Sequence, residues 1–214
     1  MIKRARTTDT PHLVSEAVGL ALWRVSRDPT GTAFSASATR RNRFSPVYAP
    51  DGSLVPAWYG ATTDRGAIFE SVFHDIRPSH AAPRVMPNQY LDRVLAPVVT
   101  TRDLSLVDLT TDGLHAIGIR RTALIESTSQ RYAWTNEIAR QLRAAAPTAD
   151  GFIWVSRARD TARSLVLYAD AGRASMIAPE AGTPLLLASG PGLLLLRAFA
   201  TPAGITVVVP SGAS

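Results

Sequence analysis

Hydrophobic and polar residues alternate with a period of two at 90–99 and 104–109, and several other short apolar runs are also typical of strands. The strands expected on this basis span residues 22–26, 54–60, 90–99, 104–109, 151–156 and 164–169. Two more apolar runs, 193–199 and 205–209, are joined by a turn-like Thr-Pro-Ala-Gly segment and are also expected to be strands. The pattern therefore predicts a sheet at the centre of the fold.

Helical spacing of apolar residues occurs in three other places. Residues 13–22 are expected to form a short helix that leads into the first strand. Residues 65–75 form the second expected helix, and the polar side chains at 62–64 are suited to cap its N-terminus. The clearest helix spans 130–145 and ends before Pro147.

Separated helices and strands of this kind favour an α+β domain, here with a central mixed or antiparallel sheet flanked by helices. The 214 residues fit a compact single domain spanning 1–214. The polar residues 1–11 are expected to form a flexible N-terminus. Apolar residues make up 46% of the chain, so a substantial core can form and wholesale disorder is excluded.

Composition and motif content remove several kinds of chemistry. The chain has no cysteine, which excludes disulfides, thiolate metal sites, iron–sulfur clusters and a cysteine nucleophile. The histidines, His12, His74, His80 and His115, fall in different predicted elements, so no metal site is expected. Motifs typical of phosphate-binding loops, dinucleotide-binding folds, serine hydrolases and zinc proteases are absent.

No segment of the sequence is expected to enter a membrane. The most apolar run, 184–196, is interrupted by glycine, proline and serine and is too short to span a bilayer. The basic residues near the N-terminus are not followed by the apolar stretch of a secretory signal. The cytoplasm is therefore the expected location.

Basic side chains outnumber acidic ones, and almost all of them are arginines. The net charge is +6, and Lys3 is the only lysine. Guanidinium groups grip phosphate and carboxylate in a bidentate fork, so the candidate partners are nucleic acid, a nucleotide or an acidic protein. The densest basic segment, 40–43, lies in an irregular stretch without a nucleic-acid-binding motif. A solvated loop explains that segment more simply, so direct contact with nucleic acid is not expected.

One set of residues, drawn from distant parts of the chain, is more specific. Arg43 and Phe44 precede Tyr59, which ends a predicted strand, and Glu70 lies one to two turns into the helix that follows. A strand end and the helix that it feeds can present both side chains to one cleft. Ser156 ends another predicted strand, where sites on sheets are often built.

The order of these segments resembles the RES domain family, the toxin half of Xre–RES toxin–antitoxin pairs. The segments that carry the resemblance are 22–25, 43–44, 57–59, 67–70 with His74, and 150–157, followed by 165–168. Together they cover roughly residues 20–170, and residues 171–214 have no firm match. Arg43 departs from the family pattern, because it follows Arg41-Asn42 instead of glycines and precedes Phe44 instead of tryptophan. Arg41 is therefore an alternative equivalent of the family arginine.

The resemblance implies an ADP-ribosyltransferase-like fold and a toxin that degrades NAD⁺. Such a toxin would cleave the nicotinamide–ribose bond by phosphorolysis or hydrolysis and so arrest growth, using NAD⁺ as substrate and no metal. An ADP-ribosyltransferase acting on a protein target is one alternative, and a non-enzymatic partner-binding module is another. The implied partners are an Xre-type antitoxin, NAD⁺ and, for phosphorolysis, inorganic phosphate. Homo-oligomerisation is left open by the sequence.

The resemblance also assigns roles to particular side chains. The residues that it places in catalysis are Glu70, Arg43, Tyr59 and Ser156, and those that it places in NAD⁺ binding are Arg24, Arg43, Tyr59, Ser156 and His74. A carboxylate such as Glu70 stabilises the oxocarbenium-like cation that forms on the ribose. An arginine fork fits the pyrophosphate, and Tyr59 is suited to stack on nicotinamide or orient the ribose. Each residue also has a structural alternative, such as an ion pair of Glu70 with Arg65 or a buried structural partner for Arg24.

Overall fold

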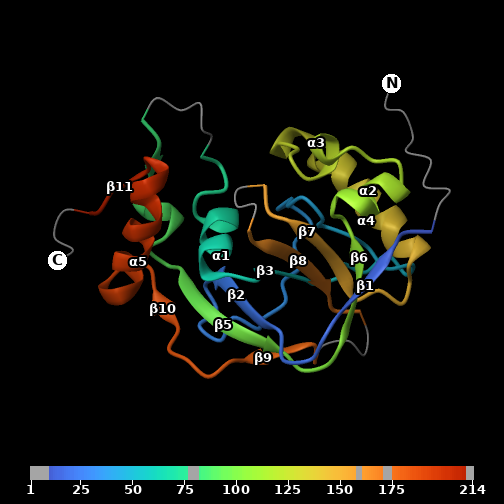
Figure 1. Ribbon diagram of the computed structural model, residues 1–214, viewed down its shortest axis with the longest axis horizontal. Coiled ribbons are helices and arrows are strands. Elements are labelled where there is room, and N and C mark those ends of the chain that lie inside the picture. The colour runs from blue at the N-terminus through green and yellow to red at the C-terminus, as the bar shows by residue number, and fades with distance from the viewer. Residues whose placement is uncertain (1–9, 77–81, 158–160, 171–174, 211–214) are drawn as a thin grey trace.

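The computed structural model describes residues 10–76, 82–157, 161–170 and 175–210 (Figure 1). Apart from its last two residues, the N-terminal segment expected to be flexible lies outside these ranges. No helix within them is long and apolar enough to cross a membrane.

A nine-stranded sheet forms the centre of the fold, in the order β1-β6-β7-β8-β3-β2-β5-β10, with β9 also paired to β5. Its strands are β1 (Leu13–Glu16), β2 (Ala21–Ser26), β3 (Ala57–Ala61), β5 (Val94–Thr100), β6 (Leu104–Asp108), β7 (Gly151–Val155), β8 (Arg163–Tyr168), β9 (Ile177–Pro179) and β10 (Leu185–Leu186). The β6–β7 pair is parallel and the other pairs of this sheet are antiparallel. A separate short parallel pair joins β4 (Arg84–Val85) to β11 (Thr206–Val207).

Helices lie around this curled sheet in two groups (Figure 1). The α-helices are α1 (Asp64–Ser71), α2 (Thr111–Ala116), α3 (Arg121–Leu124), α4 (Tyr132–Ala145) and α5 (Gly190–Ala200). Single 3₁₀ turns occur at Pro87–Gln89, Ser129–Arg131 and Thr201–Ala203. The expected α+β fold, with a central mixed sheet flanked by helices, is confirmed.

Strand parity separates two core regions on opposite faces of the sheet. Tyr59 lies opposite Val166 across the β3–β8 pair, and Val166 lies opposite Phe152 of β7. These side chains belong to the face covered by α4, while their chain neighbours Trp58 and Ile153 pack on the other face. Residues of β7 and β3 that share the parity of Tyr59 therefore point toward the helices.

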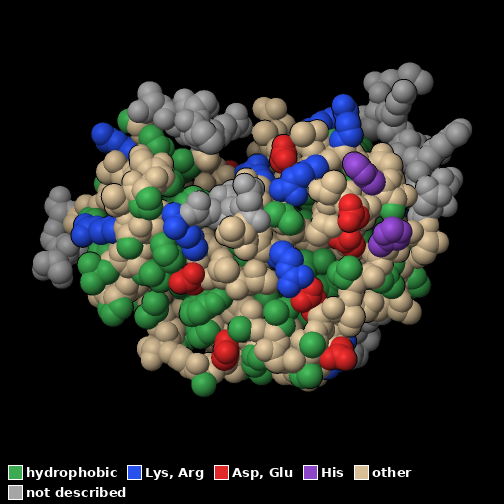
Figure 2. All heavy atoms as spheres, in the orientation of Figure 1, with side chains coloured by type: hydrophobic (Ala, Val, Ile, Leu, Met, Phe, Trp, Pro, Cys, Tyr) green, Lys and Arg blue, Asp and Glu red, His purple; other side chains and the backbone are tan. Residues whose placement is uncertain are grey.

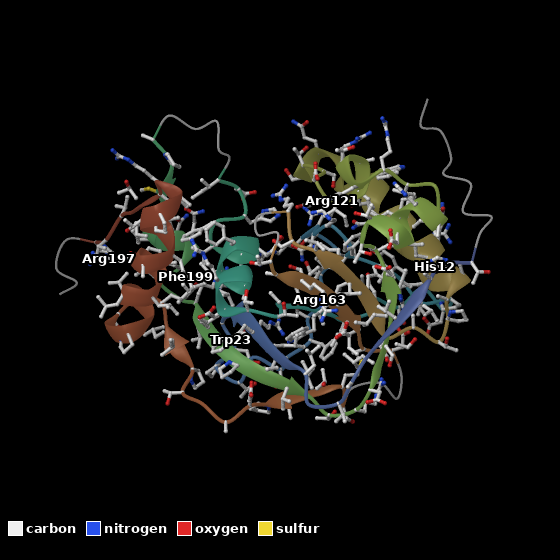
Figure 3. The ribbon with its side chains drawn as sticks, viewed as in Figure 1. His12, Trp23, Arg121, Arg163, Arg197 and Phe199 are labelled. Atoms are coloured by element: carbon white, nitrogen blue, oxygen red, sulfur yellow. The ribbon has the colours of Figure 1, made fainter. Side chains whose placement is uncertain are left out.

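The helix α1 is fixed at both its start and its side. The Thr63 hydroxyl accepts a hydrogen bond of 2.9 Å from the Gly66 N–H, which confirms the expected N-cap. In the first turn of α1, the Arg65 guanidinium lies over two rings, 5.7 Å from the centroid of Phe69 and 5.3 Å from that of Phe199. Phe199 extends from α5 toward α1 (Figure 3), so α5 packs against the helix that carries Glu70.

Two expected elements are wrong. Residues 13–22 form no helix: they comprise β1, a turn at Gly19 with φ of 83°, and the start of β2. Residues 193–199 lie in α5 and not in a strand. Pro191 occupies the first turn of α5, where its missing N–H has no intrahelical partner to lose.

Candidate functional site

Glu70 and Ser156 are brought into direct contact. The Ser156 hydroxyl donates a hydrogen bond of 2.5 Å to Glu70 Oε1. Ser156 is fully buried at the end of β7, where its N–H donates to the Ala162 carbonyl over 2.9 Å. Gly66 permits the close approach of α1, because a Cβ added there would lie 2.8 Å from the Ala162 methyl group. These contacts place a half-buried carboxylate over the end of β7.

A second helix fixes the end of β7 from the other side. Arg121 of α3 donates to the Val155 carbonyl over 3.0 Å, beside Ser156 (Figure 3). Its Nε also pairs with Glu126 at 3.1 Å. The Ser156 side chain is therefore presented on a strand end that is held by both α3 and the Ala162 backbone.

Arg43 is buried, and its backbone is pinned against α4. The Thr135 hydroxyl donates to the Arg43 carbonyl over 2.5 Å, and the Asn136 amide donates to the same oxygen over 3.1 Å. Phe44 anchors the next position in the core, where Tyr168 donates to its carbonyl over 2.8 Å. This loop therefore carries Arg43 inward, although its sequence lacks the glycines of the family pattern.

Arg43 is only 4% exposed to solvent, and its Nε and Nη2 have no hydrogen-bond partner among the described residues. Burial lowers the pKa of Arg43, while the nearby Glu70 carboxylate opposes that shift and the Arg157 guanidinium adds to it. A buried cation with free donors is poised to bind an anionic group.

Tyr59 supports the Arg43 loop from the sheet. It lies in the middle of β3 and not at its end. Its hydroxyl bonds to the Ser45 hydroxyl at 3.0 Å and accepts from the Phe44 N–H at 3.2 Å. Burial raises the pKa of Tyr59 far above its ordinary value, so the phenol stays neutral. Both contacts tie Tyr59 to the two residues that follow Arg43.

His74 joins the C-terminal side of α1 to α4 and to β7. Its Nε2 lies 3.1 Å from the Tyr132 hydroxyl, and its Nδ1 lies 2.9 Å from Asp75. The Arg157 guanidinium donates to the His74 carbonyl over 2.8 Å and to the Ser127 carbonyl over 3.3 Å. Burial and the Arg157 charge lower the pKa of His74, which therefore favours the neutral imidazole.

We call this group the Glu70 cluster, whose members are Arg43, Tyr59, Glu70, His74, Tyr132, Ser156 and Arg157. Tyr132 and Arg157 are absent from the residues assigned on the sequence. Arg157 is the last residue of the segment 150–157 that carries the resemblance, so the sequence did contain a signal for it. Tyr132 opens α4 on its buried face, within the helix expected at 130–145, and no motif of the sequence marks it.

Arg24 lies apart from the Glu70 cluster. It follows Trp23, which lies opposite Ala61 on the α1 side, so Arg24 points to the other face of the sheet. Its guanidinium donates to the Ala33 carbonyl and lies 5.6 Å from the centroid of Trp58. Burial lowers the pKa of Arg24 to about 10, so it stays charged at neutral pH. The structural alternative for Arg24 is the one that these contacts support.

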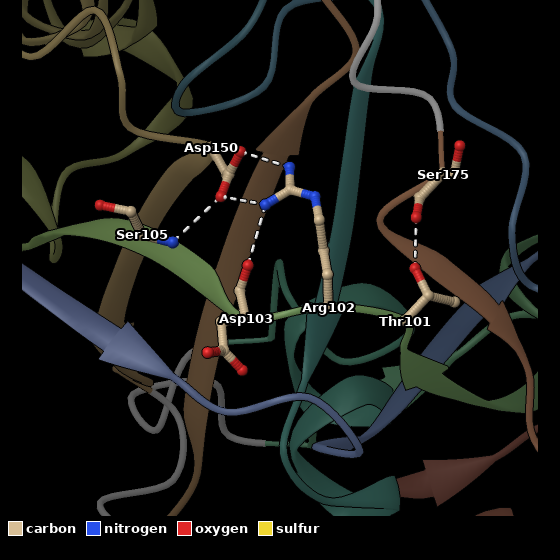
Figure 4. Close-up of polar contacts among 6 residues, drawn as sticks. All are labelled: Thr101, Arg102, Asp103, Ser105, Asp150 and Ser175. Carbon is tan, nitrogen blue, oxygen red and sulfur yellow. Dashed lines mark hydrogen bonds and ion pairs between the residues drawn. The ribbon is translucent and has the colours of Figure 1, made fainter.

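The two ends of the segment 150–157 have different surroundings. Asp150 lies at the start of β7, away from Ser156, where it pairs with Arg102 at 2.6 Å (Figure 4). The same carboxylate accepts from the Ser105 N–H over 3.0 Å. The next position, 151, requires glycine, because a Cβ there would lie 1.8 Å from the Val166 carbonyl oxygen. Asp150 and Gly151 therefore serve to join strands, whereas Ser156 and Arg157 belong to the Glu70 cluster.

Two guanidinium groups, three hydroxyl groups, one imidazole and one carboxylate make up the Glu70 cluster. Within the described ranges, no three His, Asp or Glu side chains come together as metal ligands. A carboxylate beside a buried guanidinium can instead bind a substrate that carries both a developing cation and an anionic group.

Comparisons with known proteins bear on the fold and the family of the chain. No curated protein matches the chain. A chain in the crystal structure of the M. tuberculosis MbcT–MbcA toxin–antitoxin complex has the same fold, with a TM-score of 0.53 and 16% sequence identity. The match covers 86% of this chain and 91% of that chain. The RES domain family matches residues 21–187, and the chain therefore belongs to the RES domain family.

Proposed function

We propose that this chain is the toxin of a toxin–antitoxin pair and that it consumes NAD⁺ by breaking the nicotinamide–ribose bond. The observation that carries the proposal is the contact of Glu70 with Ser156 beside the buried Arg43 guanidinium, whose Nε and Nη2 have no partner among the described residues. Membership of the RES domain family and the shared fold with a toxin–antitoxin complex support it. Degradation of a central cofactor would arrest growth.

In this proposal Glu70 acts on the ribose. As the bond from C1′ to nicotinamide breaks, its electron pair moves onto the ring nitrogen and neutral nicotinamide leaves. Positive charge then develops on the ribose, where a fixed carboxylate stabilises it. The Ser156 hydrogen bond holds the Glu70 carboxylate in one orientation before the reaction. No proton is needed by the leaving group, so a single carboxylate is sufficient.

Arg43 binds the pyrophosphate of NAD⁺ in this proposal. Its buried Nε and Nη2, which find no partner in the described ranges, match the oxygens of a phosphoryl group. Arg41 was the alternative on the sequence, but it is exposed and Arg43 is buried. Tyr59 holds the Arg43 loop through Ser45 and Phe44, so we assign it to positioning and not to stacking on nicotinamide.

Inorganic phosphate, water or a protein side chain then forms the new bond to C1′. The Arg157 charge near Arg43 favours an anionic acceptor, so we propose phosphorolysis before hydrolysis. Transfer to a protein target remains the alternative within the same chemistry. A module that only binds its partner is the alternative outside it.

An Xre-type antitoxin is the proposed partner, in keeping with the complex in which the similar fold occurs. Arg40 and Arg41 are exposed at the entrance of the Arg43 loop, where an acidic antitoxin segment would find opposite charge. On the face shown in Figure 2, Lys and Arg side chains are interspersed with Asp and Glu side chains. That distribution fits a local acidic contact better than a nucleic-acid groove.

The test is to mix the purified full chain with NAD⁺, with and without phosphate, and to follow nicotinamide by NMR. The expected result is nicotinamide release that accelerates with phosphate, together with ADP-ribose-1″-phosphate identified by its mass. Release that ignores phosphate would assign hydrolysis. Intact NAD⁺ after long incubation with excess protein, also in the presence of cell extract, would contradict the enzyme and favour the binding module.

A further inference from the structure

Trp154 carries a buried indole N–H that no contact explains. The residue is 2% exposed, and its Nε1 has no hydrogen-bond partner in the part of the chain that the structure describes. Buried donors are nearly always paired, and an unpaired one destabilises a fold. Trp58, on the other face of the sheet, shows the usual solution, because its Nε1 donates to the Gly31 carbonyl over 2.7 Å.

The position of Trp154 lies within the candidate site. It precedes Ser156 by two residues on β7, so both side chains point to the face that Glu70 covers. Its ring centroid lies 5.1 Å from that of Phe44, the residue next to Arg43. Trp154 therefore lies between the residue that contacts Glu70 and the loop that carries Arg43.

The unpaired atoms nearby share one chemical character. Arg43 Nε, Arg43 Nη2 and Trp154 Nε1 can only donate hydrogen bonds. Ser164, which lies opposite Trp154 across the β7–β8 pair, has a buried hydroxyl that is also unpaired among the described residues. Arg43, Trp154 and Ser164 thus offer hydrogen-bond donors that an oxygen-rich ligand can accept.

We propose that Trp154 is a further substrate-binding residue, whose indole N–H donates to an oxygen of the nicotinamide riboside half of NAD⁺. That half would extend from the pyrophosphate at Arg43 to the carboxylate of Glu70, and Trp154 shares the sheet face of Ser156 and packs against Phe44, next to Arg43. This inference rests on the proposed function, because it takes NAD⁺ as the ligand. It adds a residue that neither the sequence pattern nor the contacts of the Glu70 cluster assign.

Nuclear magnetic resonance of the indole groups tests the inference without turnover. The chain carrying Glu70→Gln, labelled with ¹⁵N, is titrated with NAD⁺, and the loss of one indole signal in Trp154→Phe assigns that residue. The expected result is a downfield, saturable shift of the Trp154 indole proton. The Trp58 indole, bonded to Gly31 on the opposite face, serves as the matched control and stays in place.

Kinetics supply the second measurement. Trp154→Phe keeps an aromatic ring against Phe44 but removes the donor, so we expect KM for NAD⁺ to rise about tenfold, as for one lost hydrogen bond. We expect kcat to change less than threefold. The shift of the indole signal is read with Trp154 intact, and if Trp154→Phe folds poorly, Phe variants of the other three tryptophans assign the Trp154 signal by elimination.

Two negative results have different meanings. If NAD⁺ signals broaden on binding while the Trp154 indole stays fixed, NAD⁺ binds but Trp154 does not contact it, and the inference is overturned. If neither NAD⁺ nor any indole signal responds and the wild-type chain releases no nicotinamide, the proposed function fails, and the inference fails with it.

Discussion

The Ser156 hydroxyl donates a 2.5 Å hydrogen bond to the Glu70 carboxylate, although 86 positions separate these residues in the chain. The contact requires α1 to lie against the end of β7. Gly66 allows that approach, and the Thr63 cap fixes where α1 begins. The fold therefore sets the orientation of the one carboxylate on which the proposed chemistry depends.

Replacement of Ser156 by alanine leaves the Glu70 carboxylate without this donor. A hydrogen bond to a charged group is worth about 1.5–3 kcal/mol, so kcat for nicotinamide release should fall roughly tenfold or more. Because Ser156 acts on the carboxylate, we expect KM to change little. Ser15→Ala, at an exposed position on β1, is the matched control. Equal kcat values for the two variants would contradict this role of Ser156.

Replacement of Arg43 by methionine separates binding from stability. Two nitrogens of the buried guanidinium are unpaired in the part of the chain that the structure describes, so its removal should leave the unfolding temperature unchanged or higher. Loss of the phosphoryl contacts should lower kcat/KM by on the order of 10². Thermal unfolding and initial rates measure the two effects. A clearly lower unfolding temperature would show that Arg43 has a structural partner instead.

The buried His74 predicts a pH dependence of stability. Burial and Arg157 lower its pKa in the folded state below the usual 6.5, so the unfolded chain binds the proton first as pH falls. The free energy of unfolding should therefore decrease as pH drops through about 6.5 and level off below the folded pKa. Urea unfolding of wild type and His74→Gln at several pH values isolates this contribution. Parallel curves for both chains would rule it out.

Asp150 should matter for stability and not for catalysis. Its carboxylate pairs with Arg102 and accepts from the Ser105 N–H, which joins the starts of β6 and β7. Asp150→Asn should lower the free energy of unfolding by about 1–3 kcal/mol. The kcat for nicotinamide release should stay within twofold at a temperature where the variant is folded. A large loss of kcat in a fully folded variant would place Asp150 in the site.

Most strands of the sheet were predicted from the sequence more accurately than the helix α5. Alternation located β6, and short apolar runs located β2, β7 and β8, all to within one or two residues, because one face or both faces of these strands are buried. The run of four leucines in α5 has no readable period, and it was assigned to a strand. Pro191, in the first turn, was the local signal for a helix start there.

The motifs nominated six residues, and strand parity separates one of them from the other five. Glu70, Ser156, Arg43, Tyr59 and His74 come together, but Arg24 points away from them. Only the register that sets Trp23 opposite Ala61 shows which face Arg24 takes, and register is not readable from one strand alone. Tyr132 was missed for a related reason, because its approach to His74 depends on how α4 packs against α1.

The most direct test of the account is the rate of nicotinamide release from NAD⁺ by wild type and by Glu70→Gln. Glu137→Gln, an exposed residue of α4, is the matched control. Removal of one fixed charge that stabilises the transition state typically lowers kcat on the order of 10²–10³. We predict that loss for Glu70→Gln, with Glu137→Gln at the wild-type rate. Equal rates for wild type and Glu70→Gln would contradict the central claim.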